Sequence, residues 1–145
     1  MKKIIFISLL MLISCNQNKL NNEKNPIDNF GIVIHGGAGT ILKENMSQEM
    51  ETKYRNALSK AIKVGHEILK NGGTSQQAVE KSINIMEDSP LFNSGKGAVL
   101  NSDGYSELDA SFMNGKTLNA GAISGATKIK NPISAAIKVM ENSPH

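Results

Sequence analysis

Apolar residues recur at steps of three and four over residues 54–69, a spacing that places them on one face of an amphipathic helix. Ser47 carries a side-chain oxygen that can cap the first turn of this helix, and the Asn-Gly-Gly sequence at 71–73 favours its end. The pattern therefore predicts a long helix between Ser47 and residue 71.

Two further helices are predicted. Thr74 and Gln77 fit a capping box that opens a second helix, and Pro90 forbids its continuation. The Asn-Pro pair at 131–132 is expected to cap a last helix. The inner faces of these helices would carry Ala78, Val79, Ser82, Ile83 and Met86 in the second, and Ile133, Ala136, Ile137 and Met140 in the last.

The remaining apolar runs are typical of strands. Residues 30–34 form a short apolar run that ends in a histidine and a cluster of glycines, and we expect a buried strand there. Three strand-like runs follow the second helix, at residues 98–100, 106–113 and 118–125. The Asp-Gly and Asn-Gly pairs between these runs are hairpin signals. Helices grouped beside an antiparallel sheet predict an α+β fold, arranged in layers or as a sandwich.

The composition argues against several classes of function. The chain has 145 residues and a formal net charge of +3, and aromatic residues make up only 4% of it. Lys2 and Lys3 belong to the leader, so little positive charge remains on the rest, and a nucleic-acid surface is not expected. The glycine loops match neither dinucleotide-binding nor Walker spacing. No His, Cys and carboxylate spacing suggests zinc or iron, and no organic cofactor is expected.

The first residues have the order of a secretory leader. Two lysines precede an apolar stretch that is too short to span a bilayer, and Leu-Ile-Ser-Cys at 12–15 resembles a bacterial lipobox. We therefore expect a lipoprotein signal peptide at 1–14, a lipid on Cys15, a flexible tether at 15–29 and a folded body at 30–145. This predicts an exported, lipid-anchored protein of the bacterial cell envelope. The alternative is a chance cysteine beside an ordinary signal peptide.

Two acidic residues are candidates for acid–base chemistry. Glu107 and Asp109 lie two positions apart in a predicted strand, so their side chains share a face. As a buried pair they could act as acid and base, whereas the simpler interpretation is that they accept hydrogen bonds from neighbouring turns. The simpler interpretation is favoured because no other group nearby completes a site. Similarly, His35 taken alone is more often structural than catalytic.

Five segments in order resemble the plant-type asparaginase and isoaspartyl peptidase family. They are residues 34–39 with the His-Gly-Gly loop, 90–99 with Leu-Phe-Asn-Ser-Gly, 107–110, 131–133 and 139–145. The resemblance covers residues 30–145. It implies the αββα sandwich of an N-terminal-nucleophile hydrolase, incomplete in this chain, whose precursor cuts itself ahead of a threonine. The freed threonine then attacks the amide of asparagine or of an isoaspartyl peptide.

The resemblance also implies roles for particular residues. Asn93 would support the site and the self-cleavage, and His35, Gly36 and Gly37 would lie in a glycine loop tied to self-cleavage. Backbone carbonyls would hold a structural sodium ion, and they belong to Met86, Glu87, Ser89, Phe92, Ser94 and Lys96. The implied partners are the chain's own C-terminal β-subunit portion, a small-molecule or dipeptide substrate, and a second αβ unit in a dimer.

One element of the family pattern is missing. The nucleophile belongs to a Gly-Thr-x-Gly motif, but the sequence at 39–42 ends in leucine, and neither Thr117 nor Thr127 follows a glycine. We therefore expect the N-terminal part of a longer, truncated enzyme, which alone would be poorly soluble or molten, and inactive. Two alternatives stay open. One is a short non-catalytic lipoprotein that serves as a binding module, and the other is a small hydrolase using Glu107 or Asp109.

Overall fold

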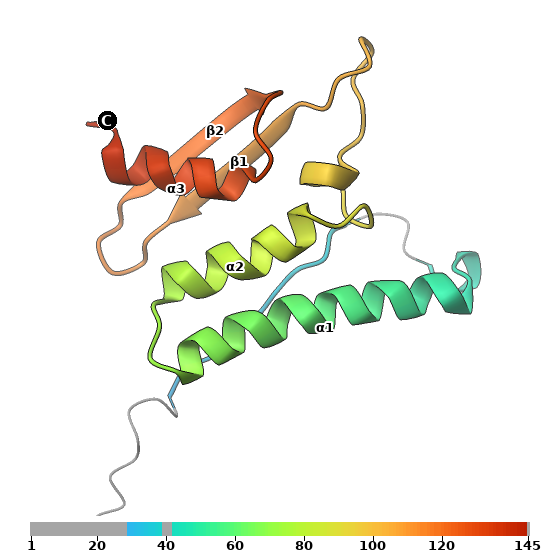
Figure 1. Ribbon diagram of the computed structural model, residues 1–145, viewed down its shortest axis with the longest axis horizontal. Helices are drawn as coiled ribbons and strands as arrows, with labels where there is room; N and C mark the ends of the chain where they lie inside the picture. The colour runs from blue at the N-terminus through green and yellow to red at the C-terminus, as the bar shows by residue number, and fades with distance from the viewer. Residues whose placement is uncertain (1–28, 39–41, 145) are drawn as a thin grey trace, which may run out of the picture.

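The computed structural model describes residues 29–38 and 42–144. The predictions for the leader, for Cys15 and for most of the tether therefore lie outside the described residues. The elements, in chain order, are η2 (Lys43–Asn45), α1 (Gln48–Lys70), α2 (Ser75–Glu87), η3 (Gly95–Gly97), β1 (Leu108–Met113), β2 (Ala120–Ala126) and α3 (Pro132–Asn142). Figure 1 shows α1, α2 and α3 stacked in that order, with the β1–β2 hairpin against α3.

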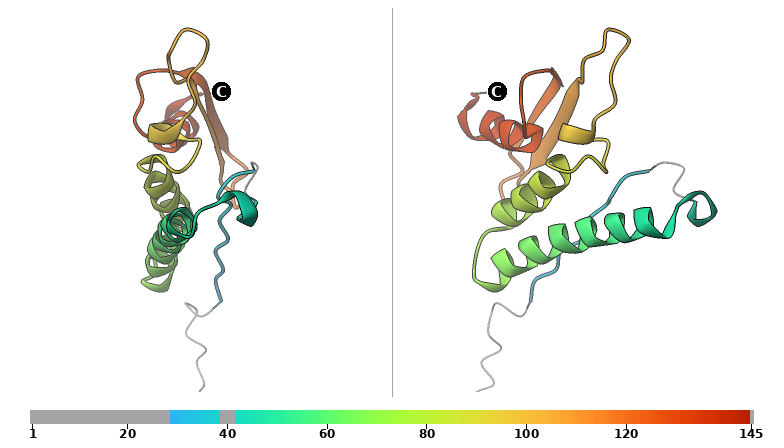
Figure 2. Two further views of the ribbon diagram at one scale, coloured as in Figure 1. Left: turned by 90° about the vertical axis from the view of Figure 1, so that its right-hand side faces the viewer. Right: turned by 45° about the vertical axis from the view of Figure 1, so that its right-hand side comes forward.

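The two predicted N-terminal helices are confirmed, with their caps. Ser47 Oγ accepts a hydrogen bond from the backbone N–H of Met50 at 3.2 Å and so caps α1. The capping box of α2 is complete: Thr74 Oγ1 accepts from the N–H of Gln77 at 3.2 Å, and Gln77 Oε1 accepts from the N–H of Thr74 at 2.9 Å. A short turn at 71–74 then lets α1 and α2 lie side by side (Figures 1 and 2).

A glycine permits the closest approach between α1 and α2. Gly65 is buried in α1, and a Cβ added there would overlap Ser82 Oγ and Ile32 Cδ1. The Ser82 hydroxyl is fully buried and has no hydrogen-bond partner among the described residues. Close packing of the helices here therefore leaves one polar atom unsatisfied, at a cost that neighbouring apolar contacts must offset.

The predicted first strand is extended but is not a strand of any sheet. Residues 30–38 pair with no other described strand. Burial still alternates along them: Ile32 and Ile34 are half-buried, whereas the side chain of Val33 is 94% exposed. The apolar run that suggested a strand is therefore extended and half-buried, but the helices and not a neighbouring strand cover its inner face. Ile34, for example, packs beside Phe92 in the core cluster formed with α1 and α2.

The sheet consists of one antiparallel hairpin. Phe112 of β1 pairs with Gly121 of β2, and the register is irregular between Leu108 and Ala110. The predicted turn at Asn114 is confirmed and connects the two strands. Phe112 packs with Ile133 and Ile137, so α3 covers one face of the hairpin. A two-stranded hairpin is marginal alone, so this helix is needed for its stability.

The predicted strand at 98–100 is wrong. These residues are irregular, and the N–H of Val99 donates to Asn93 Oδ1 at 2.9 Å instead of to a strand partner. The turn predicted after it does form, because the N–H of Asn101 donates to the carbonyl of Tyr105 at 2.8 Å. The structure is thus a mixed helical and β arrangement, compatible with the predicted α+β class.

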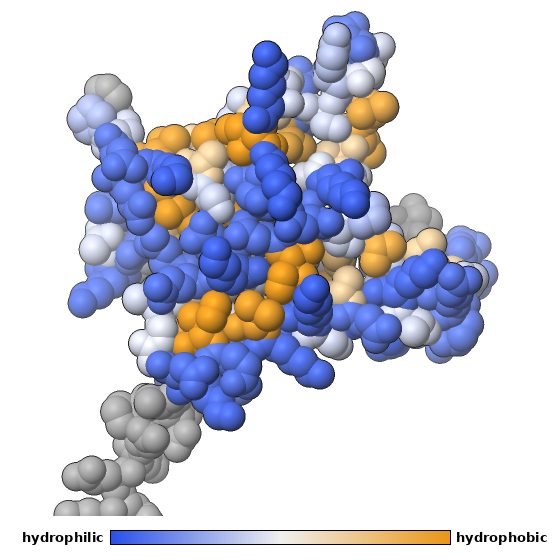
Figure 3. Space-filling model, viewed as in Figure 1, coloured by the Kyte–Doolittle hydropathy of each residue, from blue (hydrophilic) through white to orange (hydrophobic). Residues whose placement is uncertain are grey.

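The apolar surface is not confined to the interior. Figure 3 shows hydrophobic residues between the α1 and α2 layers and along the edge of the molecule near the hairpin. Val99 and Leu118 are among the large apolar side chains that stay exposed, at 70% and 68%. Within the described residues, none of the helices combines the length and apolar character that crossing a membrane requires.

Candidate functional site

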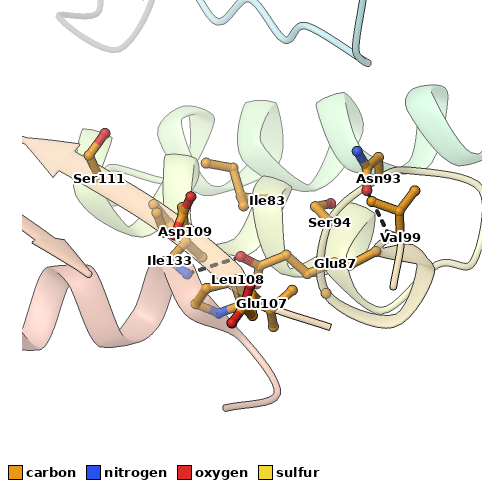
Figure 4. Close-up of a pocket in the computed structure, with 14 residues that line it drawn as sticks. Ile83, Glu87, Asn93, Ser94, Val99, Glu107, Leu108, Asp109, Ser111 and Ile133 are labelled. Carbon is orange, nitrogen blue, oxygen red and sulfur yellow. Dashed lines mark hydrogen bonds between the residues drawn. The ribbon is translucent and has the colours of Figure 1, made fainter. Parts of the chain in front are cut away.

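A cavity of about 400 Å³ lies where four segments meet. The end of α2, the loop after it, the start of β1 and the start of α3 all contribute (Figure 4). Its polar side chains come from Glu87, Asn93, Ser94, Glu107, Asp109 and Ser111. The structure therefore brings the predicted supporting residue, Asn93, to the same cavity as the two acidic candidates.

Glu87 is the most buried charged residue near this cavity, with 2% of its surface exposed. Its Oε1 accepts a hydrogen bond from the backbone N–H of Ile133 at 2.9 Å (Figure 4). Its Oε2 accepts from the side-chain amides of Asn131 at 3.1 Å and Asn84 at 3.3 Å. The carboxylate therefore satisfies a free N–H in the first turn of α3, where a negative charge is also favoured by the helix dipole.

This arrangement corrects the predicted cap of α3. Asn131 is the N-cap residue by position, but its side chain makes no capping hydrogen bond. Its amide group instead donates to the carboxylates of Glu87 and Asp88. The signal for Glu87 was present in the sequence, because a charge at that position continues the inner face of the second helix, four residues after Ile83.

Asn93 acts within its own loop. Its Oδ1 accepts the hydrogen bond from the N–H of Val99, which closes the loop between α2 and β1. Its side-chain amide nitrogen donates to no other group in the described part of the chain. That nitrogen is therefore available to a ligand in the cavity.

The predicted carbonyl ligands lie at the end of α2 and in the loop that follows it. Glycines bring parts of it into close contact: a Cβ on Gly95 would overlap the carbonyl oxygen of Glu87, and one on Gly97 would overlap that of Phe92. Gly95 also has a φ of 54°, which glycine adopts with little strain. The loop is therefore tightly folded at these two glycines, and the carbonyls of Phe92 and Ser94 accept backbone hydrogen bonds within it. No cluster of three or more His, Cys, Asp or Glu side chains suited to a metal occurs among the residues described.

The glycine loop lies beside this region but outside the cavity. The side chain of His35 is exposed, and its Nδ1 accepts from the N–H of Gly37 at 3.3 Å. A Cβ added to Gly36 would lie 3.6 Å from the ring of Phe92, the neighbour of Asn93. The two glycine-containing loops therefore meet through Phe92, although His35 is not among the residues that line the cavity.

The two acidic candidates do not form a buried pair. Both Glu107 and Asp109 are exposed. Asp109 Oδ1 accepts from the N–H of Gly125 at 2.8 Å, across the irregular part of the hairpin. This hydrogen bond, with a second from Ser124, lowers the pKa of Asp109 below its ordinary value of 3.8. Asp109 is thus a hydrogen-bond acceptor, as the simpler interpretation held. The hypothesis of a buried acid–base pair is wrong.

The lowered pKa of Asp109 makes the hairpin sensitive to acid. A group whose pKa is depressed on folding contributes stability above its unfolded pKa and loses it as the pH falls through the folded pKa. We therefore expect stability to fall on acidification below about pH 4, partly through Asp109. In Asp109→Asn this part of the acid dependence should disappear. Unfolding curves at a series of pH values measure it, and an unchanged dependence would contradict the assignment.

Similarity to known proteins shows the family of this chain. A profile of the family described as Asparaginase matches residues 28–145. The chain belongs to this asparaginase family. It is 46% identical over 114 residues to an isoaspartyl peptidase of Salmonella typhimurium and 48% identical over 114 residues to a plant-type L-asparaginase of Pyrococcus horikoshii. It is also 45% identical over 114 residues to a putative isoaspartyl peptidase/L-asparaginase of Dictyostelium discoideum.

Each similarity covers 79% of this chain but only part of the relative. The matched segment is 36% of the Salmonella and Pyrococcus proteins and 33% of the Dictyostelium protein. The chain thus spans about a third of the length of these asparaginase relatives. The predicted family is confirmed, and partial coverage fits the prediction that the chain corresponds to an N-terminal portion.

Proposed function

We propose that this chain forms the N-terminal, α-subunit region of an isoaspartyl peptidase or L-asparaginase that hydrolyses β-aspartyl amide bonds. The observation that carries the proposal is the family match, which includes both the glycine loop and the loop of Asn93. The complete domain would have the αββα sandwich of N-terminal-nucleophile hydrolases. In that sandwich the β1–β2 hairpin and residues 30–38 would be parts of larger sheets.

The reaction we propose needs a threonine outside this chain. Its hydroxyl adds to the β-aspartyl carbonyl, its own amine takes the proton, and ammonia or a peptide amine leaves as the acyl-enzyme forms. Water then releases aspartate and restores the threonine. Within this chain, Asn93 would support the reacting groups from the cavity. The amide nitrogen that has no described partner favours this role, because a carboxamide donor can stabilise charge that develops on a carbonyl oxygen.

We further propose a structural sodium ion in the loop after α2. The tight backbone approach at Gly95 and Gly97 is consistent with carbonyl oxygens directed to one point, and carbonyls are ligands that hard cations accept. The proposed ligands are the carbonyls of Met86, Glu87, Ser89, Phe92, Ser94 and Lys96. The ion would hold the loop of Asn93 in place and take no part in the bond chemistry.

The remaining proposals concern location and assembly. The order of leader, lipobox and tether supports a lipid on Cys15 and a place in the bacterial envelope. The proposed partners are a β-subunit portion and a second αβ unit. A separate binding module has no observation in its favour, since the relatives that match are named as peptidases or asparaginases.

A chimera tests the proposed function. Residues 30–145 would replace the aligned segment of the Salmonella isoaspartyl peptidase, and hydrolysis of β-aspartyl dipeptides and asparagine would be measured. We expect self-cleavage and turnover in the chimera. In Asn93→Ala we expect turnover to fall by roughly 100-fold, since one oxyanion-type donor contributes about that much.

Glu44→Ala is the matched control. Glu44 is exposed, does not line the cavity, and makes no ion pair among the described residues. It should leave turnover unchanged. A folded chimera that neither cuts itself nor hydrolyses either substrate would contradict the proposal.

A further inference from the structure

Three Asn-Gly or Asp-Gly pairs occur in the described residues, and they differ in whether the glycine N–H donates a hydrogen bond. The N–H of Gly72 donates to the carbonyl of Leu69 at 3.0 Å, and that of Gly104 donates to the carbonyl of Asn101 at 3.1 Å. The N–H of Gly115 donates to no described residue. This difference matters because the glycine nitrogen is the nucleophile when an asparaginyl-glycyl pair cyclises.

The carboxamide oxygen of Asn114 also accepts two hydrogen bonds within the turn. This Oδ1 accepts from the N–H of Lys116 at 3.0 Å and from the N–H of Thr117 at 3.3 Å. These bonds fold the side chain back over the turn, whose backbone contains the nitrogen of Gly115. They also stabilise negative charge on Oδ1, which is the charge that develops when a nucleophile adds to the carboxamide carbon.

We propose that Asn114 is a site of spontaneous deamidation, and that the fold protects Asn71 from the same reaction. The Gly115 nitrogen loses its proton and forms a bond to Asn114 Cγ, the Cγ–Nδ2 bond breaks, and ammonia leaves. Water then opens the resulting succinimide at either carbonyl, giving aspartate or isoaspartate. No redox change occurs, and the only co-reactant is water. The proposal is independent of the proposed function.

The geometry at Asn71 explains the protection. Asn71 ends α1 and donates its own N–H to the carbonyl of Glu67 at 3.1 Å. Gly72 has a φ of 80°, and its nitrogen is engaged with Leu69. To react, this segment must break the hydrogen bond of the Gly72 nitrogen and unwind the end of α1. At Asn114 the nitrogen of Gly115 has no such bond to break within the described residues.

The product alters the hairpin. Deamidation places a negative charge at Asn114, and isoaspartate adds a methylene to the backbone. Both the N–H and the carbonyl of Asn114 hold the turn, through Asn119 at 2.8 Å and Leu118 at 2.7 Å. A longer backbone at this residue cannot keep both bonds in their present geometry, so the isoaspartyl form should have a weakened connection between β1 and β2.

A time course on the purified chimera that carries residues 30–145 tests the proposal. The chimera is incubated at mildly alkaline pH and digested briefly with trypsin near neutral pH, and the exchange of NH for oxygen is followed by mass spectrometry. The tryptic peptide that ends at Lys116 reports Asn114, and the one that ends at Lys81 reports Asn71. We expect Asn114 to react roughly tenfold faster, a ratio that corresponds to about 1.4 kcal/mol of activation free energy.

Two controls separate the fold from the local sequence. In concentrated urea both Asn-Gly pairs should react at similar rates, because no hydrogen bond then protects Gly72. Gly115→Ala should slow the reaction at Asn114 alone, since a Cβ there meets no atom within 4 Å and so leaves the turn intact while it hinders the nitrogen. Equal rates in buffer, the same ratio in urea, or no effect of Gly115→Ala would each overturn the proposal.

Discussion

Replacing Glu87 by alanine should lower the free energy of unfolding by about 3 kcal/mol. The loss includes charge-assisted hydrogen bonds of about 1.5–3 kcal/mol each, reduced because Asn84 and Asn131 regain water. The buried N–H of Ile133 loses its acceptor altogether. The same change should weaken the connection between the end of α2 and the start of α3, which the bond from Ser134 to Glu80 still holds farther along. Urea unfolding of the chimera monitored by circular dichroism measures the loss, and amide hydrogen exchange at Ile133 locates it.

Two variants sharpen this test. Glu87→Gln keeps the shape and one carbonyl oxygen, so we expect a smaller loss than for alanine. Glu49→Ala removes a glutamate whose side chain is 77% exposed and whose ion pair with Lys53 is on the surface of α1, so its effect should stay within about 0.5 kcal/mol. Equal effects of Glu87→Ala and Glu49→Ala would show that the buried carboxylate does not stabilise α3.

Replacing Gly121 by alanine should have the second large effect. Gly121 is buried in β2, and a Cβ there would overlap the carbonyl oxygen of Ala136 and the backbone nitrogen of Met140. Both atoms belong to the backbone of α3, so no side-chain rotation relieves the clash. The helix must move away from the sheet, and we expect a loss of about 2–3 kcal/mol, as for other overpacked sites.

Gly115→Ala is the matched control for Gly121→Ala. It adds the same methyl group to the same hairpin, but in open space and at a φ outside the left-handed region. We expect no loss of stability there, and a slight gain because alanine restricts the unfolded chain more than glycine does. Melting temperatures of the two variants, made in the chimera and measured side by side, test this. Similar melting temperatures would mean that α3 does not rest directly on β2.

Local signals were sufficient for the helices and for the family. The capping box of Thr74, the cap at Ser47 and the spacing of apolar residues in α1 all depend on neighbours within four residues, and all three are confirmed. The resemblance depended on short ordered segments, and the family match confirms it. The turn at Asn114 was likewise predicted from its own sequence.

Contacts between distant residues could not be predicted in this way. Asn131 looked like an ordinary cap, yet the acceptor for α3 is Glu87, 46 positions earlier in the chain. The apolar run at residues 30–34 correctly predicted an extended backbone, but such a run does not say whether a strand or a helix covers it. The cavity beside Asn93 combines four separate segments, and their meeting depends on how α2 and α3 pack.

The distant cap of α3 also bears on the order in which the protein folds. An isolated helix of 11 residues is too short to persist in water, so α3 requires both the hairpin surface and the carboxylate of Glu87. The contact closes a long stretch of chain, whereas α1 and α2 meet through a short turn and can associate early. The α1–α2 pair can therefore form first and present the carboxylate of Glu87 at its end, so that α3 packs onto an acceptor that is already in place.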